Sequence, residues 1–180
     1  MTPLALLTIS LMATILMIAP LLYTQRHERK STISHYAAKT PLIHGFYIAC
    51  NIIATTSFYI FALIFFNGTR YGMLLIATSS IGYISGIIQA AIPAKGKIEK
   101  YHDISSSIMG YFMVITGVLA VLLIPQPPII STVTKTIALC FILALPLSFI
   151  IKTKYYYRVQ IVALSLFYLE LFLVVISANS

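Results

Sequence analysis

Long apolar runs separated by short polar breaks extend through the whole chain. Within each run the apolar residues are continuous rather than alternating with polar ones, which favours helices over a membrane barrel, because a spanning helix satisfies its own backbone hydrogen bonds. Each run is close to the roughly 20 residues that a helix needs to cross a bilayer. The pattern therefore predicts an all-α membrane protein, a six-transmembrane-helix bundle in one integral membrane domain. The predicted spans cover residues 3–23, 44–66, 71–92, 106–124, 130–151 and 159–178.

The polar breaks differ in length and charge. Residues 24–43 form the longest one, where Pro41 and the polar side chains argue against a further span, and part of this segment is expected to lie along the membrane surface as a short helix. Residues 91–107 form the central break and hold three lysines, two acids and one histidine. Three prolines after residue 124 end the fourth span, because proline lacks the amide hydrogen that a helix uses.

Composition sets the class of protein. The chain is 59% hydrophobic and 9% charged, against a usual charged share of about 25%, which excludes an ordinary soluble domain. Its net charge of +8 does not indicate nucleic-acid binding, because the charges lie only in short breaks, where anionic lipid headgroups are the expected partners. Cys50 and Cys140 lie inside apolar runs and are interpreted as small buried hydrophobic residues. No cofactor is predicted, since no span carries paired histidines or a lysine deep inside it; Lys135 lies near the end of its predicted span.

The basic residues are distributed unevenly between the two sides of the predicted bundle. Of 12 lysines and arginines, only Arg70 and Lys135 belong to one side. The first, third and fifth breaks carry the others: Arg26, Arg29, Lys30, Lys39, Lys95, Lys97, Lys100, Lys152, Lys154 and Arg158. Because cytoplasmic loops are enriched in lysine and arginine, these breaks are predicted to face the cytoplasm. Both termini then lie outside the cytoplasm, in a multi-pass protein of the cytoplasmic (inner) membrane.

The third span carries a strip of small residues. Thr78, Gly82, Gly86 and Ala90 follow one another at intervals of four, so they share one helix face along which another helix can approach closely. We predict that this face packs against other helices and that the third span lies in the bundle interior. The functional alternative is that the same smooth face lines a ligand groove.

One ionisable residue, Glu170, lies deep in a predicted span. It is about 18 Å from the inner end of the last span at 1.5 Å per residue. A lone carboxylate at this depth is costly unless it is protonated, paired or next to water. The expected state is a protonated acid hydrogen-bonded to hydroxyl groups, either coupling proton or cation binding to function or fixing helix packing. The same depth is shared by Thr55, Thr56, Ser79, Ser80, Tyr83 and Cys140.

Polar side chains gather at the predicted cytoplasmic face, where all four histidines of the chain lie. His102 and Asp103 in the central break, with His44 at the start of the second span, are candidates to line one polar vestibule. Asn51 and Gln89, near the inner ends of the second and third spans, would complete it. The alternative, which is favoured for most of the histidines, is that they are solvated or interfacial residues, and His102 is the best exception. These histidines and acids lack the i, i+4 spacing of metal ligands, so no metal site is predicted. The candidate ligand or ion site therefore comprises Glu170, His102, Asp103, His44, Asn51, Gln89, Ser79 and Tyr83.

Two passages carry a family resemblance: GIIQAAIPAKGKIEKYHDISSSIMGYFMVITGVLAVLLI, where a span ends at a proline and a histidine opens the next, and TISHYAAKTPLIHGFYIACNII. Together they resemble the uncharacterised prokaryotic six-span membrane protein family called domain of unknown function 998. The resemblance implies a six-span fold in a bacterial or archaeal membrane and supplies no established activity. The positions that match the family pattern are Ser34, Pro93 and His102.

These observations leave three classes of function. The first is a non-enzymatic membrane protein that binds or transports a small or lipidic ligand within its helix bundle. The second is an accessory or structural subunit of a larger membrane complex, with the small-residue face of the third span as its interface. The third, ranked last because the sequence displays no nucleophile or metal ligands, is an enzyme acting at the cytoplasmic face through His102 and Asp103. Membrane lipids are the expected partners, and a homo-oligomer stays open.

Overall fold

The computed structural model describes the chain except for residues 1, 25–32, 38–39, 95, 151–155 and 179–180, and gives only the backbone of residues 20–24, 35–36, 145–150 and 156–158. The described residues form helices and contain no strand, so the all-α prediction is confirmed for them. The helices are α1 (Pro3–Thr24), α2 (Ile33–Ala37), α3 (Pro41–Phe66), α4 (Gly72–Ala91), α5 (Glu99–Leu123), α6 (Pro128–Ile150) and α7 (Tyr156–Ala178).

Four helical segments are long and apolar enough to cross a membrane: Pro41–Phe66, Gly72–Ala91, Gly96–Leu123 and Val159–Ala178. Within α1 and α6 the described apolar segments are the shorter Pro3–Ala19 and Pro128–Ala144. The rest of each of these two helices has no described side chains. Four spans are thus supported by length and composition, and the prediction of six stays a prediction.

Four helices, α3, α5, α6 and α7, begin earlier than the apolar runs indicated, and the difference is largest for α5. α5 begins at Glu99 and not at residue 106, and a 3-10 turn over Gly96–Ile98 precedes it. Its first turns carry Glu99, Lys100 and Asp103, so hydropathy alone missed them. α3 begins at Pro41 because the Thr40 side chain accepts a hydrogen bond from the Ile43 amide at 3.3 Å, and proline is tolerated in the first helical turn.

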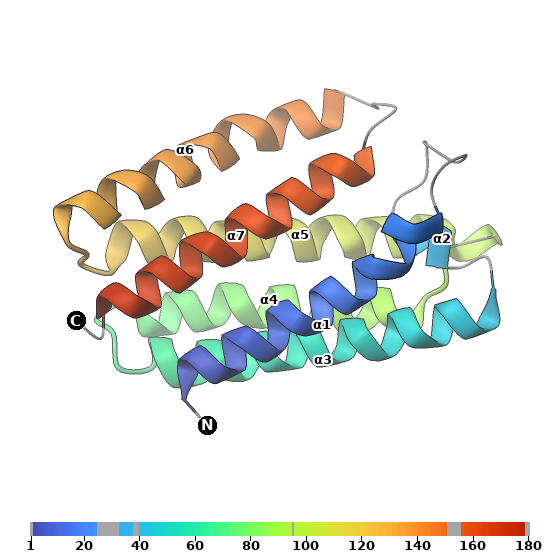
Figure 1. The fold of residues 1–180 in the computed structure, drawn as a ribbon, viewed down its shortest axis with the longest axis horizontal. Coiled ribbons are helices and arrows are strands. Elements are labelled where there is room, and N and C mark those ends of the chain that lie inside the picture. Colours follow the sequence, from blue (N-terminus) through green and yellow to red (C-terminus); the bar gives the residue numbers. More distant parts are fainter. Residues whose placement is uncertain (1, 25–32, 38–39, 95, 151–155, 179–180) are drawn as a thin grey trace.

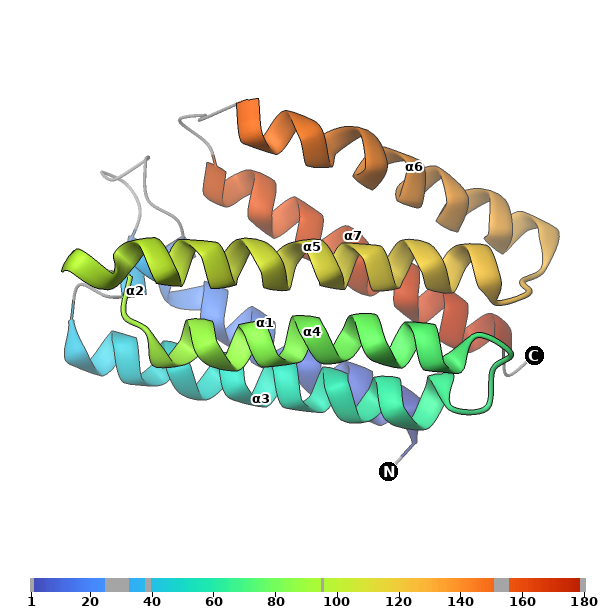
Figure 2. The same cartoon turned by 180° about the vertical axis from the view of Figure 1, so that it is seen from behind.

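The six long helices run alternately in opposite directions, so both chain termini lie at the same end of the molecule (Figures 1 and 2). α1 packs on α3, α3 on α4 and α4 on α5. α7 contacts both α5 and α1 and so closes a ring of five helices, while α6 packs on α5 and α7 from outside. The short helix α2 lies between α1 and α3, and its place at a membrane surface stays a prediction.

α4 forms part of the ring wall rather than the bundle interior that its small residues predicted. Its small-residue face is buried, whereas Leu74, Ile81, Ile84 and Ile88 on other faces are exposed. A helix whose large apolar side chains point away from the protein is suited to contact lipid on that side. Cys140 on α6 is likewise exposed, contrary to the prediction, whereas Cys50 on α3 is buried.

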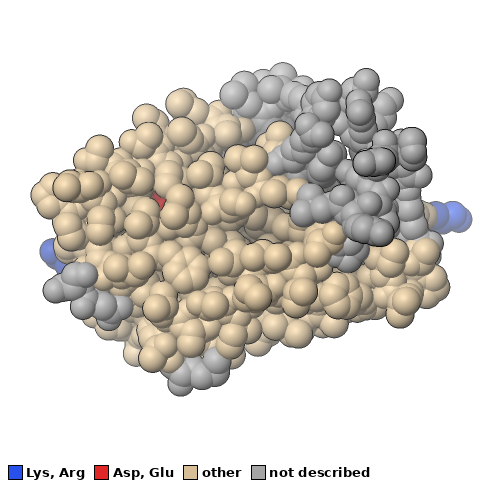
Figure 3. Space-filling view, viewed as in Figure 1, with Lys and Arg blue, Asp and Glu red and all other residues tan. Residues whose placement is uncertain are grey.

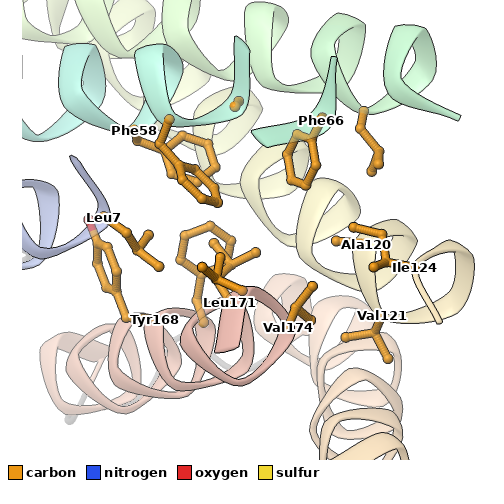
Figure 4. Packing of buried hydrophobic residues seen from close by; sticks show 14 of the residues in the cluster. Leu7, Phe58, Phe66, Ala120, Val121, Ile124, Tyr168, Leu171 and Val174 are labelled. Atoms are coloured by element: carbon orange, nitrogen blue, oxygen red, sulfur yellow. The ribbon is translucent and has the colours of Figure 1, made fainter. Parts of the chain in front are cut away.

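The core fills the end of the ring that carries the termini. Phe58 and Phe66 of α3, Leu7 of α1 and Leu171 of α7 point toward one another (Figure 4). The rings of Phe58 and Phe167 lie 5.5 Å apart, and Ala120 and Val121 of α5 complete the contact. Since Phe66, Leu7 and Leu171 are fully buried, side chains close the ring at this end.

The outer surface carries an apolar belt. Among the described residues on the face shown in Figure 3, lysine and arginine lie at the two ends of the molecule, and apart from a small area of acid no charge lies between them. Many of the exposed side chains along the long helices are large and apolar. Lys97 and Lys100 have described side chains at one end, and Arg70 lies at the other. The remaining basic side chains of the first, third and fifth breaks lie outside the described residues.

Candidate functional site

A cavity of about 270 Å³ lies inside the ring of helices, toward the end opposite the termini. It is larger than the roughly 150 Å³ cavity that holds benzene in an engineered protein and close to the lower end, about 300 Å³, of typical ligand pockets. Its lining comes from α1, α2, α3, α4, α5 and α7. Helices far apart in the sequence therefore build one site.

Hydrogen bonds hold one side of the cavity wall together. Gln89 Nε2 on α4 donates to Tyr47 Oη on α3 at 2.8 Å, and the Tyr47 hydroxyl is also hydrogen-bonded to Ser34 of α2. One turn further along α3, Asn51 Nδ2 donates to the Gly86 carbonyl at 3.5 Å. These bonds tie α2, α3 and α4 to one another at the cavity.

A cluster of three buried hydroxyl groups joins α1 to α7. Tyr168 Oη lies 2.6 Å from Ser10 Oγ and 2.9 Å from Thr14 Oγ1. Ser10 donates its proton to the Ala54 carbonyl and Thr14 donates to the Ser10 carbonyl. The Tyr168 hydroxyl therefore supplies the one proton available to these two side-chain oxygens, and it can donate to one of them at a time. Thr14 and Tyr168 line the cavity, whose second side is thus also fixed by hydrogen bonds.

Two buried glutamine oxygens in the lining lack a partner. Gln89 Oε1 on α4 and Gln160 Oε1 on α7 are buried and accept no hydrogen bond within the described part of the chain. Among the described lining residues there is no aspartate, glutamate, lysine, arginine or histidine. The lining is therefore uncharged among its described residues, and two of its side chains carry a buried neutral acceptor without a partner.

Of the predicted ligand-site residues, Asn51 and Gln89 line the cavity. The other members of the predicted vestibule do not. His102 is only 1% exposed, and its Nδ1 lies 2.6 Å from the Ile92 carbonyl just after α4, whereas the next residue, Asp103, is exposed. Successive positions on a helix point about 100° apart, so neighbours in sequence do not share one site. His44, half-buried at the start of α3, also lies outside the lining.

Ser79 and Tyr83 of α4 also lie outside the cavity lining. Ser79 Oγ donates to the Leu75 carbonyl of its own helix at 2.7 Å. Tyr83 stacks on Tyr59 of α3, with ring centroids 4.6 Å apart. Both side chains take part in helix packing in this structure rather than in a shared polar site.

Glu170 is fully buried on α7, but the expected hydrogen bonds to hydroxyl groups are absent from the described residues: neither carboxyl oxygen has a partner. The group faces α5, where a Cβ added at Gly117 would lie 3.0 Å from Oε2. Hydroxyls at the same depth are already satisfied, because Thr55 and Ser79 donate to carbonyls of their own helices. Glu170 lies outside the cavity lining.

The small-residue face of α4 is buried along its length at Thr78, Gly82, Gly86 and Ala90. Thr116 of α5 donates a hydrogen bond to Thr78 Oγ1 at 2.9 Å. At Gly86, an added Cβ would lie 2.9 Å from a methyl carbon of Thr55 on α3 and 3.1 Å from the sulfur of Met109 on α5. This face therefore contacts two helices of the same chain.

Sequence reasoning missed several residues of the site, among them Tyr47, Tyr168 and Gln160. Gln160 carries the one signal that was available, a polar side chain at the start of an otherwise apolar run. The tyrosines gave none, because the chain has 12 of them, spread over both the apolar runs and the polar breaks.

The described residues contain no group of three or more histidine, cysteine, aspartate or glutamate side chains that could hold a metal ion. Comparisons with protein-family models, with curated proteins and with solved structures found no match to this chain. The resemblance to the domain of unknown function 998 family therefore stays a prediction, and the geometry of the cavity is what bears on function.

Proposed function

We propose that this chain is an integral membrane protein of six spans that binds an uncharged small or lipidic ligand in the cavity among α1, α3, α4, α5 and α7. The observation that carries the proposal is the cavity itself, about 270 Å³ inside a ring whose outer surface is apolar. A well-packed bundle of this size leaves few voids larger than a water molecule. A cavity with a wall fixed by hydrogen bonds is therefore better explained as a binding site than as a packing defect.

The lining favours an uncharged ligand. Its described side chains are apolar or neutral and polar, and a buried charge without a countercharge costs far more than a hydrogen-bonded neutral group. Binding is supported better than transport, because the ring beyond the cavity is filled by the core around Phe58, Phe61 and Phe66. Glu170 lies beyond the lining as well, so the proposal gives it no role in contacting the ligand.

The proposed orientation keeps both termini outside the cytoplasm, in the cytoplasmic membrane. The cavity lies toward the end that carries the first, third and fifth breaks, which hold ten of the chain's 12 basic residues. Under the positive-inside rule the ligand is then bound in the cytoplasmic half of the membrane, next to loops that contact anionic headgroups.

Occluding the cavity tests the proposal. Gly110 of α5 lies in the lining, and a Cβ added there meets no atom within 4 Å, so Gly110→Leu places a side chain in open space at the cavity. Native mass spectrometry of the purified protein should show a bound molecule in the wild type that Gly110→Leu loses. Gly45→Leu is the matched control, since Gly45 on α3 is also open but lies outside the lining. Equal retention of bound mass by all three proteins would refute the proposal.

The second function that the sequence leaves open is that of an accessory subunit in a larger membrane complex. The interface assigned to it, the small-residue face of α4, is covered by α3 and α5 of the same chain. An enzyme acting through His102 and Asp103 is supported less, because His102 is buried against a backbone carbonyl and Asp103 is exposed. Ligand binding is thus the function that the geometry favours.

A further inference from the structure

We infer that the cavity takes an uncharged lipid whose polar end donates at least two hydrogen bonds, one to Gln89 Oε1 and one to Gln160 Oε1. A monoacylglycerol, with two hydroxyl groups and one acyl chain, represents this class. The inference rests on the proposed function, and it adds the chemistry by which the ligand is recognised.

The first step is the orientation of Gln89. Its Nε2 donates to Tyr47 Oη at 2.8 Å, and Tyr47 is held in turn by Ser34. In this arrangement Nε2 is the donor, so Oε1 of this lining residue remains as an acceptor, buried and without a partner in the described chain. Burying an acceptor with no donor is costly, and a ligand hydroxyl removes that cost.

The second step is that Gln160 supplies another unpartnered amide oxygen from a different helix. It lies on α7, and its Oε1 is also buried, unpartnered among the described residues and part of the same lining. Two acceptors on two helices of one cavity call for two donors on the ligand. Neither oxygen is charged, and the described lining holds no cation that would balance a phosphate or carboxylate.

The remaining wall indicates a hydrocarbon portion. Met109 and Met113 of α5 face the cavity together with Leu164 and Phe167 of α7. Methionine side chains are flexible and adapt to irregular apolar shapes such as acyl chains. At about 270 Å³ the cavity holds a polar end and the first carbons of a chain rather than a whole two-chain lipid.

The test uses three uncharged lipids that differ in the number of donors: monooleoylglycerol has two hydroxyls, oleyl alcohol has one and methyl oleate has none. The full-length protein is placed in phosphatidylcholine nanodiscs, because that headgroup has no hydrogen-bond donor. Binding of each lipid is measured by native mass spectrometry. Affinity should fall about fivefold with each donor removed, the range expected for one net hydrogen bond.

Substitutions of the two glutamines test whether their side-chain oxygens accept hydrogen bonds from the ligand hydroxyls. Gln160→Met, similar in length but without an acceptor, should lower monooleoylglycerol affinity about fivefold and leave methyl oleate binding unchanged. Gln89→Met should also lower monooleoylglycerol affinity about fivefold and leave methyl oleate binding unchanged. Circular dichroism checks that this variant stays folded after losing the hydrogen bond to Tyr47. The matched control is Ser165→Ala, also on α7, whose exposed hydroxyl bonds its own helix and lies outside the lining.

The outcomes separate this inference from the proposed function. Equal binding of all three lipids, blocked by Gly110→Leu, would overturn the requirement for donors and leave the binding function intact. Equal binding of monooleoylglycerol and oleyl alcohol would overturn the two-donor requirement. Binding of none of them, together with no bound mass sensitive to Gly110→Leu, would remove the binding function itself.

Discussion

Polar side chains inside the apolar helices mostly satisfy themselves. Ser79, Ser80 and Ser165 each donate to the carbonyl four residues earlier in the same helix. Such bonds let a hydroxyl remain in an apolar setting without a partner from another helix. The Glu170 carboxyl group makes no such bond to its own helix. It is buried against Gly117 without a hydrogen bond among the described residues.

Replacing Glu170 with methionine should therefore stabilise the protein. The substitution removes a buried carboxyl group that has no partner in the described chain, and it keeps a flexible side chain of similar length. We expect the free energy of unfolding to rise by about 1–3 kcal/mol, the usual penalty for a buried unsatisfied polar group. The measurement is denaturation in detergent micelles, followed by far-UV circular dichroism.

The control for this substitution is Glu170→Gln, which keeps the shape and leaves a polar group in place. It should change the unfolding free energy by less than about 1 kcal/mol. A methionine variant that unfolds more readily than both the wild type and the glutamine variant would mean that the carboxyl group makes a stabilising interaction. Ligand binding lost in both variants would return Glu170 to the coupling role considered for it from the sequence.

The sequence predicts a depth for Glu170, which stays a prediction, and it could not predict the neighbours of this side chain. Depth follows from counting residues along a helix. The residue that contacts the Glu170 side chain depends on how each helix is rotated about its axis and on which helix lies next to it. The hydropathy pattern determines neither. For this reason Thr55 and Ser79 seemed plausible partners, whereas the group in contact is Gly117 of α5.

At the scale of the elements, one close helix contact lies at Gly86. A Cβ at this position would lie 2.9 Å from Thr55 on α3 and 3.1 Å from Met109 on α5. Small residues let helices approach in this way, and the gain is van der Waals contact along both neighbours. The i+4 spacing of the strip could be recognised in the sequence, but which helices cover it could not.

Gly86→Ala should loosen this contact. The added methyl forces α3 or the Met109 side chain to move, and overpacking of this kind costs about 1–3 kcal/mol of stability. Gly45→Ala on α3 is the control, because its Cβ would meet nothing within 4 Å and alanine favours a helix by up to about 1 kcal/mol. Both are measured as midpoints of unfolding in the same detergent. Equal midpoints for the two variants would show that the Gly86 contact is not tight.

Helices were the most predictable elements, because each apolar run is long and uninterrupted. The exceptions are the beginnings of α3 and α5, which depend on the Thr40 cap and on a charged first turn rather than on hydropathy. The cavity was least predictable. It arises where five helices leave space between them, so only two residues of the predicted vestibule, Asn51 and Gln89, line it.

At the scale of the whole molecule, the alternating helices put the termini at one end and the cavity toward the other. The positions of the described charges agree with two water-facing ends, with Arg70 at the terminal end and Lys97 at the opposite end. The assignment of one end to the cytoplasm rests on the number of lysines and arginines in each polar break. A direct measurement of sidedness therefore decides where a ligand can enter.

The decisive pair of variants is Arg70→Cys and Lys97→Cys, each made in a background where Cys50 and Cys140 are replaced by alanine. Both positions are exposed, so both cysteines can react with a maleimide that does not cross membranes. In intact cells Arg70→Cys should be labelled, and Lys97→Cys should be labelled only after the membrane is permeabilised, because the positive-inside rule places residue 97 in the cytoplasm. The reverse labelling pattern would mean that the protein has the opposite orientation and that the cavity lies in the outer half of the membrane. Labelling of both in intact cells would contradict a single orientation, and with it the assignment of the cavity to either half.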